Sequence, residues 1–188
     1  MNSRKIVITG GPSTGKTSVI NALEKKGFWC LHEVIRTMTL EQKHLGSETE
    51  FKTNPIVSVA DPLAFNQMIL KARLAQYEKA ITCKESFVFF DRGIPDVLAY
   101  MDCFDQVYGV EFEDAARSNP YDLIFLMPPW REIHVVDNER FESFEESLLV
   151  NTCLLNRYTA LGYDVQIVPK NTVADRVDFI LDFLNKTM

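Results

Sequence analysis

The sequence predicts an α/β protein with a parallel sheet that is covered by helices on both faces. Short, continuous apolar runs alternate with longer segments of helical periodicity, which is the pattern of α/β proteins. The short runs are apolar throughout, as strands buried on both faces are. Of the 188 residues, 46% are hydrophobic and 24% are charged, which is a globular composition. A chain of this length is expected to form one domain.

The N-terminal third begins with a β-branched run at residues 5–9, which we expect to be the first strand. A helix should follow over residues 15–26, because a glycine ends the periodic pattern there. Residues 28–31 are the second predicted strand. Residues 34–58 contain glycine and proline breakers, and we expect a short helix and a loop.

An aspartate–proline pair, typical of an N-cap and first helical position, opens a long predicted helix from 61 to about 83. Residues 87–90 form the third predicted strand. Two helices are expected next, at 95–108 and 112–117, and the fourth strand spans 121–127.

The segment 130–143 is charged and mostly aperiodic. A helix is expected over 144–161, since a glycine follows its last periodic residue. The fifth strand then covers 163–168, and a final helix covers 172–184.

The turn after the first strand has the sequence Gly-Gly-Pro-Ser-Thr-Gly-Lys-Thr, which matches G-x-x-x-x-G-K-[ST], the phosphate-binding P-loop. Its glycines let backbone N–H groups converge on phosphate oxygens, and the following helix adds its N-terminal donors. Lys16 supplies a charge for the outer phosphates, and Thr17 a hydroxyl for Mg²⁺. The residues predicted to bind ATP are Gly10, Gly11, Pro12, Ser13, Thr14, Gly15, Lys16, Thr17 and Ser18.

An acid–arginine pair follows the third predicted strand. Asp91 at this position of a P-loop fold would hold Mg²⁺ or contact the acceptor, although an aspartate that caps the next turn is the alternative. Arg92 can fork onto a phosphate or a substrate hydroxyl. Asp96 fits the role of a helix N-terminal residue better than that of a ligand.

With these motifs, the chain resembles the P-loop nucleoside and nucleotide kinases. It is most similar to ribosylnicotinamide kinase domains and the small AAA-labelled ATPases grouped with them. The resemblance rests on residues 10–17, 33–36 and 91–93 and on the charged segment. It implies one P-loop NTPase domain over 1–188, a three-layer sandwich with strand order 2-3-1-4-5 and a lid at about 130–143. The acceptor would lie over the carboxyl ends of strands two and three.

The resemblance also implies roles for single residues near that acceptor. Glu33 would be the general base on the attacking hydroxyl, and the alternative is a surface salt bridge with Arg36. Arg36 would contact the acceptor or the transferred phosphate. Gln67, next to Phe65 on the long helix and followed by Arg73, would read the acceptor, although Phe65 also fits a core position.

The lid of such kinases brings arginines to the transferring phosphate. Arg131 and Arg140 are the candidates here, and a solvated loop is the alternative. The predicted catalytic residues are therefore Lys16, Glu33, Asp91, Arg92, Arg131 and Arg140; the predicted acceptor-binding residues are Glu33, Arg36, Gln67 and Arg92; and Thr17 and Asp91 are the predicted metal ligands.

These observations favour an ATP- and Mg²⁺-dependent kinase that phosphorylates a nucleoside or a related metabolite. A P-loop NTPase, or a nucleotide-dependent regulator acting with a protein partner, is the alternative. No internal N-K-x-D element that would read guanine is present, and the chain is too short to carry the helical lid domain of an AAA+ motor.

Charge and cysteine content limit the remaining options. The net charge of −6 disfavours nucleic acid as a partner, and no apolar run reaches the roughly 18 residues of a membrane span. The four cysteines are widely spaced, as reduced thiols of a cytoplasmic protein would be. The kinase resemblance adds a homodimer as an expected oligomer.

Overall fold

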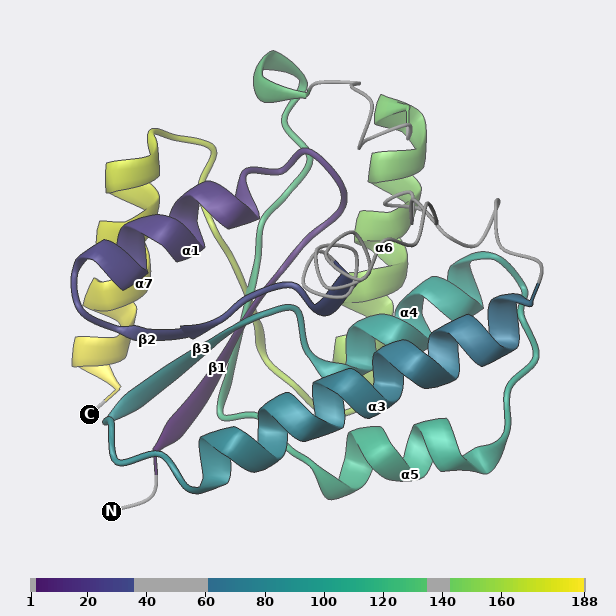
Figure 1. The fold of residues 1–188 in the computed structure, drawn as a ribbon. Coiled ribbons are helices and arrows are strands. Elements are labelled where there is room, and N and C mark those ends of the chain that lie inside the picture. The colour runs from purple at the N-terminus through teal and green to yellow at the C-terminus, as the bar shows by residue number, and fades with distance from the viewer. Residues whose placement is uncertain (1–2, 36–60, 135–142, 188) are drawn as a thin grey trace, which may run out of the picture.

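The computed structural model describes residues 3–35, 61–134 and 143–187. Its centre is a parallel sheet of five strands in the order β2-β3-β1-β4-β5, which confirms the expected order (Figure 1). Val7 in the central strand lies opposite Phe90 on one side and Ile124 on the other. The strands are β1 (Arg4–Thr9), β2 (Trp29–Leu31), β3 (Phe87–Asp91), β4 (Leu123–Leu126) and β5 (Val165–Ile167).

Helices cover both faces of this sheet, as the apolar strands require. Figure 1 shows α1 and α7 on one face and α3, α4, α5 and α6 on the other. Alternate residues of β1 divide between the two cores: Ile6 and Ile8 pack toward α1 and α7, and Val7 packs toward the larger group. The helices are α1 (Lys16–Lys25), α3 (Pro62–Ile81), α4 (Ile94–Cys103), α5 (Val110–Ser118), α6 (Phe144–Ala160) and α7 (Val173–Lys186).

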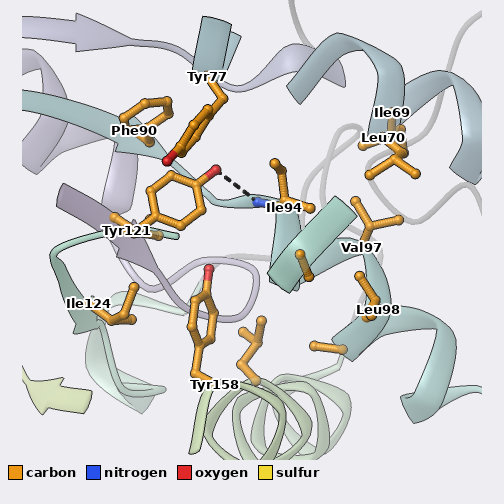
Figure 2. Packing of buried hydrophobic residues seen from close by; sticks show 14 of the residues in the cluster. Ile69, Leu70, Tyr77, Phe90, Ile94, Val97, Leu98, Tyr121, Ile124 and Tyr158 are labelled. Atoms are coloured by element: carbon orange, nitrogen blue, oxygen red, sulfur yellow. Dashed lines mark hydrogen bonds between the residues drawn. The ribbon is translucent and has the colours of Figure 1, made fainter. Parts of the chain in front are cut away.

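An aromatic cluster in the larger core fixes where α4 begins. The ring of Tyr121 meets the rings of Tyr77 and Phe90 edge-on, at centroid distances of 5.4 and 5.1 Å. Its hydroxyl accepts a hydrogen bond of 3.1 Å from the backbone N–H of Ile94. Figure 2 shows the hydroxyls of Tyr121 and Tyr158 both directed toward this start of α4. The core therefore holds the first turn of α4 directly after β3.

Several predicted boundaries were wrong, and two of them have a clear physical reason. α4 ends at Cys103 and not near 108, because Asp105 takes a left-handed conformation (φ 52°) and Gln106 N–H bonds back to the Met101 carbonyl. β4 is shorter than predicted, because Tyr121 lies before the strand and points into the aromatic cluster. Within the charged segment, the described part contains a short 3₁₀ helix, η2 (Arg131–Ile133). Most of the segment 34–58 lies outside the described residues.

Among the described helices, none combines the length and the apolar character that crossing a bilayer would require. All four cysteines are free thiols in the structure.

Candidate nucleotide and acceptor site

The turn between β1 and α1 depends on glycines at two positions. Gly10 has a φ of 150°, and a Cβ there would lie 2.5 Å from the carbonyl oxygen of Met127 at the end of β4. Gly15, with a φ of 85°, is the N-cap of α1 and needs the left-handed region that glycine tolerates. Thr14 closes the turn by donating its hydroxyl to the Gly11 carbonyl at 3.0 Å. The loop therefore curls tightly into the N-terminus of α1, where backbone donors bind anions.

Lys16 extends from this N-terminus into the loop and is 9% exposed. Its Nζ donates to the Gly11 carbonyl at 2.7 Å. Burial, together with the nearby Arg92, lowers the pKa of Lys16 to about 7, although Asp91, Glu33 and Asp96 act in the opposite direction. A bound polyphosphate would restore full protonation, because anionic oxygens favour the ammonium form.

A cavity of about 560 Å³ opens beside the loop. We divide the residues that line it into two groups, according to the elements that supply them. We call the first the loop half, which is lined by residues 12–18, Trp130, Ile133, residues 170–173 and Arg176. The second, the helical half, is built from the end of β2 and from α3, β3 and α4, and it is lined by Glu33, Ile35, Phe65, Asn66, Ile69, Arg73, Arg92, Asp96, Val97 and Tyr100.

Two carboxylates and two arginines form a closed network in the helical half. Glu33 follows β2, and its carboxylate pairs with Arg92 Nε at 2.6 Å and with Arg73 Nη2 at 3.3 Å. Arg92 also reaches Asp96 at 3.1 Å, and its guanidinium lies 5.2 Å from the ring centroid of Tyr100. Arg73 lies 3.9 Å from Asp96. Thus α3, the end of β2, β3 and α4 are joined by charge at one place.

Asp96 is the most enclosed member of that network, at 1% exposure. It accepts hydrogen bonds from the hydroxyls of Thr9 and Tyr158, both at 2.6 Å, and from Gly93 N–H at 2.9 Å. Burial alone would raise its pKa, but Arg73 and Arg92, together with the two hydroxyl donors, lower the pKa below its ordinary value. Asp96 is therefore held as a carboxylate.

Asp91 ends β3 between the two halves and is 4% exposed. Its Oδ1 is buried and has no hydrogen-bond partner among the described residues. Burial and the nearby Glu33 raise the pKa of Asp91 to about 6, although Lys16 and the two arginines counteract the shift. An unpartnered carboxylate oxygen that shares a cavity with the Thr17 hydroxyl fits a divalent cation, since Mg²⁺ takes one or two carboxylates together with phosphate oxygens.

A family model described as an AAA domain matches residues 5–176. The chain belongs to this family. Comparison with curated proteins gives no match.

Solved structures place this AAA domain among folds of nucleoside and nucleotide kinases. Deoxyadenosine kinase from M. mycoides with bound dATP is 16% identical, with a TM-score of 0.69 over 97% of this chain and 99% of that one. Thymidylate kinase from Candida albicans is 14% identical, with a TM-score of 0.67 over 99% and 92%. A NadR protein in complex with NR is 17% identical, with a TM-score of 0.72 over 98% of this chain and 51% of that one. These likenesses show the fold.

The structure of the AAA domain brings most of the predicted site residues together. The loop residues 12–18, Glu33, Asp91 and Arg92 all line the one cavity. Gln67 does not join them, because it lies on the exposed side of α3, whereas the neighbouring Asn66 lines the cavity.

The predicted lid is only partly within the described residues. The side chain of Arg131, in η2, is 70% exposed, and its Nη2 lies 3.3 Å from the Glu145 carboxylate. Its guanidinium carbon lies 4.2 Å from the ring centroid of Phe144. It therefore points along α6 and not into the cavity. Arg36 and Arg140 lie outside the described residues.

Sequence reasoning missed Arg176, which α7 delivers to the loop half. Its Nη1 donates to the Thr14 carbonyl at 2.9 Å, and its guanidinium lies 4.9 Å from the ring centroid of Trp130. Burial lowers the pKa of Arg176. No local motif surrounds Arg176, so only the packing of α7 against α1 could have revealed it. Asp96 lies in the first turn of α4, as predicted, and accepts from Gly93 N–H there. Its contacts with Arg73 and Arg92 have no local signal.

Proposed function

We propose that the protein is a phosphotransferase that moves the γ-phosphate of ATP to a small-molecule acceptor, a nucleoside or a related metabolite. The observation that carries this proposal is the composition of the cavity. A phosphate-binding loop and a separate network of two acids and two arginines face the same space. A hydrolase needs only to position water and has less use for a second recognition surface.

ATP would bind in the loop half. The N–H groups of the loop and the start of α1 would hold the phosphates, and Lys16 would place its charge on the outer ones. Trp130 and Arg176 lie beside the loop as a ring and a planar cation, a pair that suits an aromatic base.

The acceptor would bind in the helical half. Glu33 would orient the attacking hydroxyl and accept its proton, since this transfer depends mainly on positioning and charge stabilisation. Its bonds to Arg92 and Arg73 fix the carboxylate in place. Arg92 would take part in transfer by positioning Glu33, and it would stay paired with that carboxylate. Arg36 and Gln67 remain predicted acceptor contacts, and Arg131 and Arg140 remain predicted lid arginines.

The Thr17 hydroxyl and the Asp91 carboxylate are the residues that would hold Mg²⁺. When bound, Mg²⁺ supplies charge neutralisation on the phosphate oxygens. The unpartnered, buried Asp91 Oδ1 supports this assignment.

The fold relatives support a nucleoside-type acceptor, since they include a deoxyadenosine kinase and a NadR protein in complex with NR. We also propose that the protein acts in the cytoplasm as a homodimer, without a nucleic-acid or membrane partner. The free cysteines support a cytoplasmic location. The net charge of −6 disfavours binding to nucleic acid.

The direct test is ATP consumption with Mg²⁺ across a panel of nucleosides, ribosylnicotinamide, nucleoside monophosphates and other small metabolites. Lys16→Ala serves as the blank. A single acceptor that stimulates turnover supports the kinase and identifies its substrate. Steady hydrolysis with no response to any acceptor contradicts it and favours an NTPase that acts with a protein partner.

A further inference from the structure

Among the described residues of the helical half, two arginines and two carboxylates balance each other in charge. Arg92 pairs with Glu33 at 2.6 Å and with Asp96 at 3.1 Å, and Arg73 pairs with the same two carboxylates at 3.3 and 3.9 Å. The side chains of all four are at most 13% exposed. Among the described residues that line this half, each cation therefore already has two carboxylate partners.

Asp96 is arranged to neutralise Arg73 and Arg92 and not to bind a ligand. Its Oδ1 accepts hydrogen bonds from the Thr9 hydroxyl and Arg92. Its Oδ2 accepts hydrogen bonds from the Tyr158 hydroxyl and Gly93 N–H. Both oxygens thus have two donors inside the protein, which leaves little accepting capacity for an incoming molecule. Its charge, however, acts on both arginines.

The other described residues that line the helical half are uncharged. Phe65, Ile69, Val97 and Tyr100 present apolar and aromatic surface to the cavity. Among the described residues that line this half, Asn66 supplies a side-chain amide, which is 3% exposed. The Asn66 amide is oriented by a 2.8 Å hydrogen bond that it donates to Gln106. Such a surface suits a flat ring with a few polar edges.

We infer that the helical half selects an uncharged, unphosphorylated acceptor over its monophosphate, and that Asp96 sets this preference by neutralising Arg73 and Arg92. The inference rests on the proposed kinase function and specifies its acceptor. A phosphate dianion would have to draw an arginine away from its carboxylates. Glu33 or Asp96 would then face the dianion as a buried, unpaired like charge, which is strongly unfavourable.

The first test compares matched acceptors for the wild-type protein with Mg²⁺ and ATP. Adenosine is paired with AMP, thymidine with TMP, and ribosylnicotinamide with its monophosphate, and kcat/KM is measured for each. We expect the unphosphorylated member of the productive pair to be preferred by about 100-fold or more. Preference for the monophosphate would overturn the inference while the kinase stands. Transfer to no member of the panel would overturn both.

The second test changes the charge at Asp96. Asp96→Asn is expected to lower the preference ratio about tenfold, because Arg73 and Arg92 each lose a carboxylate partner. Asp102→Asn is the matched control, since Asp102 also lies on α4 and pairs with an arginine, Arg157, away from the cavity. An unchanged ratio in Asp96→Asn, or an equal fall in the control, would overturn the role of Asp96.

A further pair of variants separates charge from packing. Tyr158→Phe removes one hydrogen bond to Asp96 but keeps every charge, so the ratio should stay unchanged. Arg73→Gln removes a cation and should raise the ratio, which gives a test of the opposite sign if Asp96→Asn does not fold. A fall of the ratio in Arg73→Gln, or in Tyr158→Phe, would contradict the account.

Discussion

The loop half and the helical half of the cavity are built in different ways. The loop half depends mainly on one continuous segment, residues 10–17, in which a strand, a glycine turn and a helix follow one another. The helical half joins Glu33, Arg73, Arg92 and Asp96 from four separate elements. Local sequence can thus encode the main part of a phosphate site, whereas an acceptor site depends on tertiary packing.

The largest expected effect lies in the loop half. Lys16→Ala should lower ATP turnover by about 1,000-fold, because it removes the charge that the loop aims at the outer phosphates. Steady-state ATP consumption with the best acceptor measures this. Lys25→Ala, in the last turn of the same helix, is the matched control and should behave as the wild type. Comparable loss in both variants would show damage to α1 and not loss of a phosphate contact.

The next largest expected effect is on transfer to the acceptor, which depends on the helical half, and not on ATP hydrolysis, which depends on the loop half. Glu33→Gln should reduce phosphoryl transfer to the acceptor by about 100-fold, because the amide cannot take the proton of the attacking hydroxyl. Slow hydrolysis of ATP without acceptor should persist, since the loop half is intact. Glu24→Gln provides a control carboxylate, one that pairs with His32 at the surface. Unchanged transfer rates in Glu33→Gln would remove Glu33 from the role of base.

The orientation of α3 can be tested with two adjacent residues. Asn66→Leu should raise the KM for the acceptor about tenfold, because a buried amide that faces the cavity is replaced by an apolar group. Gln67→Leu is the natural comparison, and the KM for ATP should not move in either variant. A larger effect at Gln67 than at Asn66 would favour the assignment made from sequence over the one made from the cavity.

The last expected effect is on stability at the boundary of the halves. Burial and Glu33 raise the pKa of Asp91 from 3.8 to about 6, so the ionised form is disfavoured in the folded state. Asp91→Asn should therefore raise the free energy of unfolding at neutral pH by about 1–3 kcal/mol, while Mg²⁺-dependent turnover is lost.

The sign of that effect depends on pH. In the wild type, the stabilisation from the protonated Asp91 is fully present below 3.8 and is lost as the pH rises through about 6. The advantage of the asparagine variant should thus disappear as the pH falls between these values, as measured by denaturant titration. Asp164→Asn, at an exposed aspartate, is the control. A less stable Asp91→Asn protein at neutral pH would contradict the burial cost.

Much of the fold could be predicted because its signals are local. The five apolar runs and the glycine turn gave the strands and the loop, and the kinase resemblance gave the strand order that the structure confirms. The end of α4 was misjudged, because the left-handed turn at Asp105 has no clear signature in a periodic pattern. β4 is shorter because Tyr121 packs into the aromatic core and does not extend the strand, and such packing cannot be read from the local sequence.

The helical half was difficult to predict, because its contacts join residues that are far apart in the sequence. Asp96 contacts residues that are 87 and 62 positions away, Thr9 and Tyr158, and its local appearance is that of a helix-start acid. The side of α3 that faces the cavity is set by packing, and Asn66 and Gln67 are indistinguishable by spacing alone. The placement of Glu33 and Asp91 was predictable, since both stand at the carboxyl ends of apolar strands that meet at one edge of the sheet. The role of Glu33 as a base came from the kinase resemblance.

The central claim is that phosphate leaves the loop half and arrives on a molecule in the helical half. The most direct measurement follows γ-labelled ATP and records where the label goes, with Lys16→Ala as the blank. With the productive acceptor present, we expect the label to be recovered covalently on that acceptor in amounts equal to the ADP formed. Recovery of the label only as inorganic phosphate, whatever acceptor is supplied, would contradict it.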